Sequence, residues 1–172
     1  MQRKSFAEME CPIARSIEEV GDGWTLLILR NAFLGARRFA DFEARLGIPP
    51  NTLTRRLERL VSLGLFTRHR YEARPPREEY ELTEKGLALL PVILALAAWG
   101  NRWLMPDQVA IECMDPKTRR ALDPVLVDRS TRRELLPGEV ALRAGPCASP
   151  ALREGLRRGV VLGAAAPRAE AP

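Results

Sequence analysis

Hydrophobic residues recur at helical spacing through roughly the first hundred residues, and this regularity fades afterwards. The spacing predicts five helices, over residues 12–20, 23–34, 39–46, 50–63 and 84–103. Between the last two helices, apolar and polar residues alternate, which predicts a β-hairpin with strands over about 65–71 and 78–83. The expected fold class is therefore mainly α with a small β wing, an α+β fold, followed by a small β-rich appendage.

The helices predicted over residues 39–46 and 50–63 are separated by a very short turn. Phe39, Phe42 and Leu46 fall on one face of the first helix, which predicts that this face is buried. Gly47 suits the end of a helix, and Pro50 suits the first position of the next, where its missing N–H costs nothing. A helix, a tight turn and a second helix in this order predict a helix-turn-helix motif.

The helix over residues 50–63 has an apolar face and a polar face. Leu53, Leu57 and Leu60 share one narrow sector. On the opposite side lie Asn51, Thr52, Arg55, Arg59 and Ser62. Arginine can bond guanine and asparagine can bond adenine, so the first residues of this helix are candidates for base contacts. Arg56 lies on the flank, where we expect it to meet a phosphate or to brace the fold. The alternative is a solvated charged face, which is common on helices.

The predicted hairpin is strongly cationic at its tip. Residues 68–77 hold four arginines against one glutamate, and Pro75 and Pro76 are expected to stop strand pairing and stiffen the tip. Such a wing can follow the phosphate backbone or place an arginine in the minor groove. The alternative is an arginine-rich loop with no partner. The full set of predicted DNA contacts is Arg38, Asn51, Thr52, Thr54, Arg55, Arg56, Arg59, Arg68, Arg70, Arg74 and Arg77.

The helix predicted over residues 84–103 is apolar on nearly all sides. Thr83 is expected to cap its N-terminus, with Glu84 in the first turn. A helix of this kind lies within a large core or between subunits. Since roughly one hundred residues do not make a large core, we expect a homodimer, whose two recognition helices would read a palindromic operator. A core within a single protomer is the alternative.

Composition narrows the function classes. The 172 residues carry a formal net charge of +5, which points only weakly to a polyanionic partner. The start lacks the apolar stretch of a signal peptide and no run of about 18 apolar residues occurs, so we expect a cytoplasmic protein with free thiols and no membrane partner. The only histidine, His69, lies in the wing and there is no glycine-rich phosphate loop, so we expect no enzyme activity. A protein-interaction module on the same scaffold is the alternative function.

Four motifs resemble those of the HxlR-type winged helix-turn-helix regulators. They are Cys-Pro at residues 11–12, Gly-x-x-Trp at 21–24, Leu-Thr-x-Arg-Leu at 53–57, and Pro-Arg-x-x-Tyr-x-Leu-Thr-x-x-Gly at 76–86. The resemblance covers residues 11–103 and departs from the family pattern at Gly23, where many members have a lysine or arginine. It implies a dimeric bacterial transcriptional regulator that binds double-stranded DNA and dimerises through its first and last helices.

The resemblance also implies a regulatory role for Cys11, because some family members sense oxidants through the cysteine near the start of the domain. Cys11 precedes a helix that begins at Pro12, and a helix N-terminus stabilises a thiolate. The alternative is a small buried residue at the dimer interface. A small-molecule effector is a second candidate signal. Five residues are expected to form either an effector pocket or part of the dimer core: Trp24, Leu90, Leu94, Trp99 and Trp103.

The chain is expected to have four parts. These are an N-terminal arm (1–10), the DNA-binding and dimerisation domain (11–104), a small β-rich appendage (105–147) and a disordered tail (148–172) with one short helix at 151–158. The appendage has candidate strands at 109–113, 125–128 and 139–143, and no internal repeat is evident. In outline it resembles the zinc-ribbon-like tail of some relatives. We expect no metal and no cofactor, because Cys113 stands alone and residues 128–131 replace a second cysteine pair.

Overall fold

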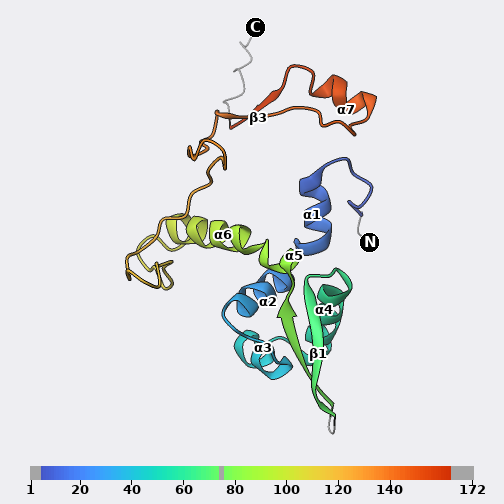
Figure 1. The fold of residues 1–172 in the computed structure, drawn as a ribbon, viewed down its shortest axis with the longest axis vertical. Coiled ribbons are helices and arrows are strands. Elements are labelled where there is room, and N and C mark those ends of the chain that lie inside the picture. Colours follow the sequence, from blue (N-terminus) through green and yellow to red (C-terminus); the bar gives the residue numbers. More distant parts are fainter. Residues whose placement is uncertain (1–4, 74–75, 164–172) are drawn as a thin grey trace. The chain divides into compact units, whose positions relative to one another are not determined.

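The computed structural model describes residues 5–73 and 76–163 of the chain, which forms two compact units, residues 1–122 and 123–172. The first unit contains α1 (Pro12–Val20), α2 (Gly23–Phe33), α3 (Phe39–Leu46), α4 (Pro50–Ser62), β1 (Phe66–Ala73), β2 (Pro76–Leu82), α5 (Glu84–Leu87) and α6 (Leu90–Trp103) (Figure 1). The second contains β3 (Val140–Leu142), α7 (Pro150–Gly155) and β4 (Val160–Leu162). The predicted α+β fold class is confirmed.

The core of the first unit lies where α2, α3 and α4 meet the base of the hairpin. Phe42 of α3, Phe66 of β1 and Tyr80 of β2 form a cluster of rings with centroids 6.3–6.5 Å apart. The other fully buried large residues come from α2, α4 and the two turns beside α4: Ile28, Leu29, Ile48, Leu53, Leu57, Leu60 and Leu65. Because the ring cluster joins α3 to both strands, it fixes the hairpin against the helices.

The two strands β1 and β2 form an antiparallel hairpin longer than the sequence predicts. Pairing runs from Phe66↔Leu82 to Ala73↔Pro76, with one irregularity between Arg70 and Glu72. The expectation that Pro76 stops the pairing is therefore wrong. A proline is tolerated at the first position of a strand, where its missing N–H need not face the partner strand. The hairpin extends past α3 and α4 (Figure 1).

The single helix predicted over residues 84–103 is two helices, α5 and α6. Pro91 occupies the second position of α6, where no intrahelical N–H is required, and the chain turns at residues 88–89 just before it. Thr83 caps α5 as predicted, since its hydroxyl accepts the Gly86 N–H at 3.1 Å. Gly86 is required here, because a Cβ would lie 2.3 Å from the Leu65 carbonyl oxygen.

Residues 84–103 also have the length and apolar composition of a membrane-spanning helix, with a mean hydropathy of 1.3 over 18 residues. This property does not require an uninterrupted apolar run, because the mean hydropathy of a window tolerates scattered polar side chains. Only 6% of that window is buried within the protomer. The apolar surface of α6 is therefore largely uncovered in a single chain.

A repeated turn, missed in the sequence, follows α6. Residues 114–122 (MDPKTRRAL) and 127–135 (VDRSTRREL) align without gaps. In each, an aspartate carboxylate accepts the backbone N–H groups two and three positions later, at 2.7 and 3.0 Å for Asp115 and at 3.0 and 2.7 Å for Asp128. Each turn, here called an Asp knuckle, then passes through an arginine with positive φ, Arg119 (61°) or Arg132 (58°).

The Asp knuckles correct the expected outline of the appendage. The counterpart of Asp128 is Asp115, not Cys113, and the candidate strands at 109–113 and 125–128 are not strands. Instead, each knuckle closes with an isolated β-bridge, Met114↔Ala121 or Val127↔Glu134. The first knuckle belongs to the first unit, which ends at residue 122. The Asn101 side-chain amide links α6 to the segment before this knuckle, because it donates to the Ile111 carbonyl at 2.9 Å.

The described part of the predicted disordered tail has regular structure. Residues 150–155 form α7, which is shorter than the predicted helix and is capped by the Ser149 hydroxyl, 3.2 Å from the Leu152 nitrogen. Residues 160–162 form β4, which pairs antiparallel with β3. Alanine and proline content predicts disorder, whereas this stretch contains a capped helix and a strand whose valines pair with Leu142 and Ala141 of β3.

Candidate nucleic-acid interface

The turn between α3 and α4 sets the direction of the second helix. Gly47 ends α3 with a φ of 58°, and its N–H donates to the Glu43 carbonyl at 2.9 Å. Ile48 then enters the core and Pro50 begins α4. The predicted helix-turn-helix motif is therefore formed, with Leu53 and the other two leucines of α4 fully buried.

The N-terminus of α3 is held by one carboxylate. Asp41 accepts the backbone N–H groups of Arg38 at 2.9 Å and Arg37 at 3.2 Å. These two hydrogen bonds, the Arg38 bond first, lower the pKa of Asp41 below its ordinary value. The ionised carboxylate also matches the positive end of the helix dipole.

The outward face of α4 carries two side chains that are ready to bind a ligand. Asn51 and Arg55 are exposed and, within the described part of the chain, their side chains have no hydrogen-bond or ion-pair partner. Thr54 is exposed too, but its hydroxyl donates to the Pro50 carbonyl at 3.0 Å. Thr52 is half-buried. An amide and a guanidinium with unused donors are the groups that recognise adenine and guanine edges.

The other two arginines of α4 contact the protein itself. Arg56 pairs with Asp22 at 3.2 Å, so it braces the fold, one of the two roles expected for it. Arg59, predicted to face DNA, donates from Nη2 to the Glu18 carbonyl at 2.8 Å. Asp22 was not predicted as a functional residue, although an aspartate before a helix is a common capping signal. It also accepts the Thr25 N–H at 3.1 Å.

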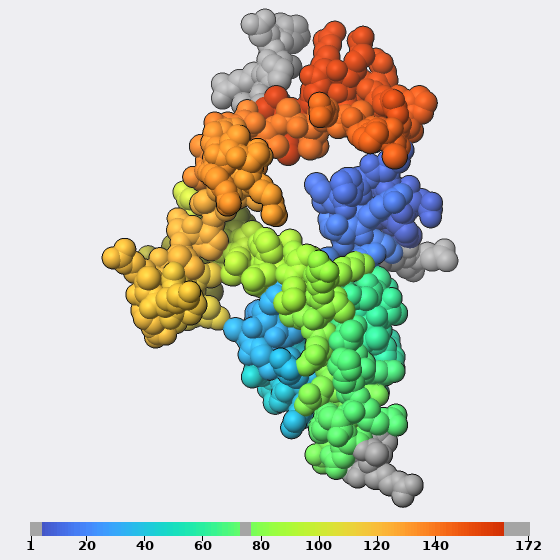
Figure 2. All heavy atoms as spheres, viewed as in Figure 1, coloured from blue at the N-terminus to red at the C-terminus, as the bar shows by residue number. Residues whose placement is uncertain are grey.

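Two of the arginines of the wing are paired with glutamates of the wing. Arg68 pairs with Glu78 at 3.5 Å and Arg77 with Glu72 at 3.2 Å. Arg70 is exposed, without a side-chain partner among the described residues, and Arg74 lies outside them. Figure 2 shows the wing, in green, projecting beyond the helices. Three of the predicted contacts thus lie along a projecting strand pair, where a duplex backbone can reach them.

The base of the wing is tied to α3 by contacts that the sequence did not indicate. Arg38 bonds Glu79 at 2.8 Å, and its guanidinium lies 4.6 Å from the centre of the Tyr71 ring. Hydrogen bonding to Glu79 is the main cause that raises the pKa of Arg38 above its ordinary value. Arg37, a second cation, pairs with Glu81 at 2.5 Å. These pairs span about forty residues of sequence, so no local pattern reveals them.

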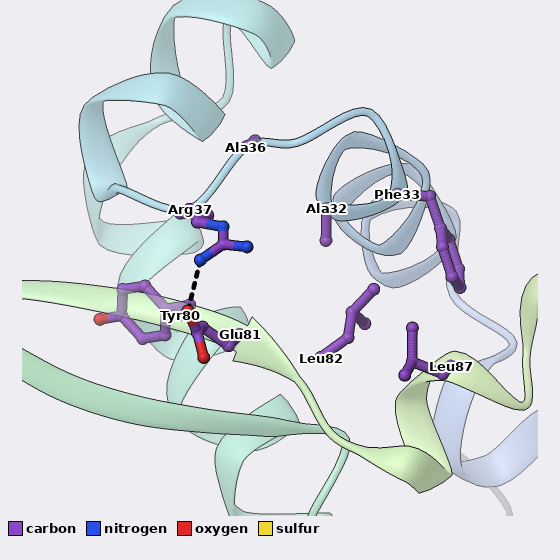
Figure 3. Close-up of a pocket in the computed structure, with 8 residues that line it drawn as sticks. All are labelled: Ala32, Phe33, Ala36, Arg37, Tyr80, Glu81, Leu82 and Leu87. Carbon is purple, nitrogen blue, oxygen red and sulfur yellow. Dashed lines mark hydrogen bonds and ion pairs between the residues drawn. The ribbon is translucent and has the colours of Figure 1, made fainter.

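A small cavity lies between α2, the α2–α3 loop, β2 and α5. Its volume is about 330 Å³, near the lower limit for a ligand site. Figure 3 shows apolar side chains along one side and the Arg37–Glu81 ion pair on the other. The residues predicted for an effector pocket do not line it. Of these, Trp24 packs against the core, while Trp99 and Trp103 are exposed.

The three cysteines are free thiols in different settings. Cys11 is half-buried and occupies the N-cap position of α1, in extended conformation and without a side-chain capping bond. Cys113 is half-buried beside the first Asp knuckle, and Cys147 is exposed. Within the described residues, no three His, Cys, Asp or Glu side chains gather as metal ligands.

Comparison with known proteins places this geometry among transcription regulators. Residues 19–108 match the HxlR-like helix-turn-helix family. Over 135 residues the chain is 42% identical to MT3179, an uncharacterised HTH-type transcriptional regulator of Mycobacterium tuberculosis, covering 78% of this chain and 85% of the relative. The crystal structure of PA1607, described as a candidate transcription factor, superposes with a TM-score of 0.74 at 31% identity, covering 83% of this chain and 99% of that one. The redox regulator HypR in its reduced form superposes with a TM-score of 0.51 at 30% identity, covering 56% and 98%.

Proposed function

Because this chain belongs to the HxlR-like helix-turn-helix family of transcriptional regulators, we propose that it binds a palindromic operator as a homodimer in the cytoplasm. In this proposal α4 enters the major groove, with Asn51 and Arg55 on base edges. The wing lies along the backbone or the minor groove. The observation that carries the proposal is the pair of exposed side chains Asn51 and Arg55 on α4, which have no partner among the described residues and lie opposite three buried leucines.

In this proposal the arginines of α4 and of the wing have different roles in DNA binding. Arg55 has no protein partner in the described chain and is available for a base. Arg77 is exposed on the projecting wing and suits a phosphate, which would replace Glu72 as its partner. Arg55→Ala should therefore relax preference at one base position and weaken binding to the correct site by about 1–3 kcal/mol. Arg77→Ala should weaken all duplexes alike.

The experiment selects preferred duplexes from a random library and then measures affinity by fluorescence anisotropy over a range of salt concentrations. Arg129→Ala is a matched control, because Arg129 is exposed in the second Asp knuckle and lies outside α4 and the wing. Equal selection profiles for the wild type and Arg55→Ala would refute the assigned orientation of α4. Failure of the wild type to prefer any duplex over competitor DNA would refute the proposed function itself.

The homodimer is supported by apolar side chains that a single chain leaves exposed. On α6 these include Leu96, Trp99 (54% exposed) and Trp103 (63% exposed). On α1, Ile13 and Ile17 are also exposed, and no residue of α1 is buried. Exposed apolar faces of this kind are typical of an interface, and a second copy supplies the same faces.

Sedimentation analysis tests the dimer. Leu96→Glu places a charge on the exposed face of α6 and should shift the protein to a monomer. Leu34→Glu is the matched control, since Leu34 is an exposed leucine (59%, against 48% for Leu96) at the C-terminal end of α2, outside α1 and α6. If both variants sediment as the wild type, α6 is not the interface.

Thiol control through Cys11 is supported by its place at the start of α1 and by the similarity to the redox regulator HypR. Hydrogen peroxide would oxidise the Cys11 thiolate to a sulfenic acid by transfer of one oxygen atom and, with one proton, would itself be reduced to water. DNA binding should then change on peroxide treatment in the wild type and stay constant in Cys11→Ser. The alternative signal is a small-molecule effector bound near Trp24, Leu90, Leu94, Trp99 and Trp103. In that case the DNA affinity of Cys11→Ser would still change when the effector is added.

A further inference from the structure

The C-terminal turn of α1 is held by cations from two other helices. Arg59 of α4 donates to the Glu18 carbonyl at 2.8 Å. Lys85 of α5 contacts the Glu19 carboxylate at 3.0 Å and the Leu63 carbonyl at 3.0 Å. One lysine therefore joins the end of α1 to the end of α4.

Arg59 and Lys85 supply the positive charge that the last turn of α1 lacks. The last carbonyl groups of a helix have no partner within the helix, and they carry partial negative charge. α1 has no basic residue in its last turn, so it does not provide its own cation. Arg59 satisfies one of these carbonyls from a neighbouring helix, which explains why it turns away from the outward face of α4.

Packing holds α1 only at its last residue, so polar contacts add to its placement. Val20 is half-buried against the core, and no residue of α1 is fully buried in the protomer. Glu18 also reaches the opposite way: its carboxylate accepts the Phe6 N–H at 3.3 Å and the Ser5 hydroxyl at 3.4 Å. The N-terminal arm, the last turn of α1 and the recognition helix therefore meet at a single residue.

We propose that Arg59 and Lys85 form a latch that sets the position of α1 against α4, and that Arg59 acts on DNA binding through α1 instead of contacting DNA. Arg59 is thus a positioning residue, and events at Cys11 or on the exposed face of α1 reach α4 through the latch. The DNA-binding consequence rests on the proposed function; the latch itself does not.

The test compares Arg59→Gln with Arg55→Gln, which removes the same charge from a neighbouring position of α4 that has no protein partner in the described chain. The first measurement is hydrogen exchange in the free protein. In Arg59→Gln the amides of residues 18–21 should exchange at least about tenfold faster, as expected for loss of one charged hydrogen bond. Arg55→Gln should leave them unchanged. Lys85→Gln, which removes the other arm of the latch, should give a second rise in exchange.

The second measurement is the salt dependence of affinity for the selected duplex. Each phosphate contact contributes about 0.9 to the slope of log affinity against log salt. Arg59→Gln should weaken binding with an unchanged slope. A slope reduced by about 0.9 would identify Arg59 as a phosphate contact and overturn the proposal. Unchanged exchange in residues 18–21 would overturn the latch whether or not the protein binds DNA, so the two failures are distinguishable.

Discussion

Replacing Gly86 by alanine tests the packing between the start of α5 and the base of the wing. The added Cβ would lie 2.3 Å from the Leu65 carbonyl oxygen and 3.0 Å from a methyl of Leu82. The carbonyl cannot move freely, because it accepts the Thr83 N–H at 3.0 Å. Overpacking against backbone costs about 3 kcal/mol, and the better helix propensity of alanine returns about 1 kcal/mol. The expected net loss is about 2 kcal/mol.

Thermal unfolding followed by circular dichroism measures this loss. A Tm about 4–8 °C below that of the wild type is expected for a chain of this size. Gly23→Ala is the matched control, because a Cβ at Gly23, the first residue of α2, would meet no atom within 4 Å. It should leave the Tm unchanged or raise it slightly. If Gly86→Ala has the same Tm as the wild type, the inferred close approach of α5 to Leu65 is wrong.

Three further outcomes follow from contacts described above. Asp22→Ala removes the cap of α2 and should cost about 1 kcal/mol in urea unfolding, whereas Asp22→Asn, which keeps the capping oxygen, should cost less. Leu57→Ala empties a fully buried site and should cost about 2–5 kcal/mol; a smaller loss would mean that the core repacks. Hydrogen bonds led by that of Ser130 lower the pKa of Asp128 from 3.8 to about 2, so its ionised form stabilises the second knuckle above pH 4 and this stabilisation is lost as pH falls towards 2. NMR titration of the carboxyl carbon checks the shift, and a midpoint near 3.8 would contradict it.

The helix-turn-helix was predictable from the sequence because its signals are local. The spacing of Leu53, Leu57 and Leu60, with Gly47 and Pro50 at the turn, determines both the buried face and the helix boundaries. The same periodicity placed Asn51 and Arg55 outward. For these residues, one helix and its flanking turn contain all the information needed.

The contacts of the other arginines could not be predicted from the sequence, because their partners are distant in sequence. Arg56 and Arg59 turn towards residues 34 and 41 positions away, and Arg38 meets Glu79 across 41 positions. The spacing of apolar residues does not predict such pairs. It did not predict the Asp knuckles either, because their repeat consists of turn-forming aspartates and not of hydrophobic spacing. The break before Pro91, by contrast, had a local signal that was outweighed by the long apolar run.

The Asp knuckles have a consequence for how the chain is made. Each is fastened by its own carboxylate within six residues, from Asp115 to Arg120 and from Asp128 to Arg133. Contacts this short in sequence form early and need no distant segment to be present. As the chain leaves the ribosome, each turn can close as soon as its last arginine emerges, so this region would acquire shape stepwise along its length.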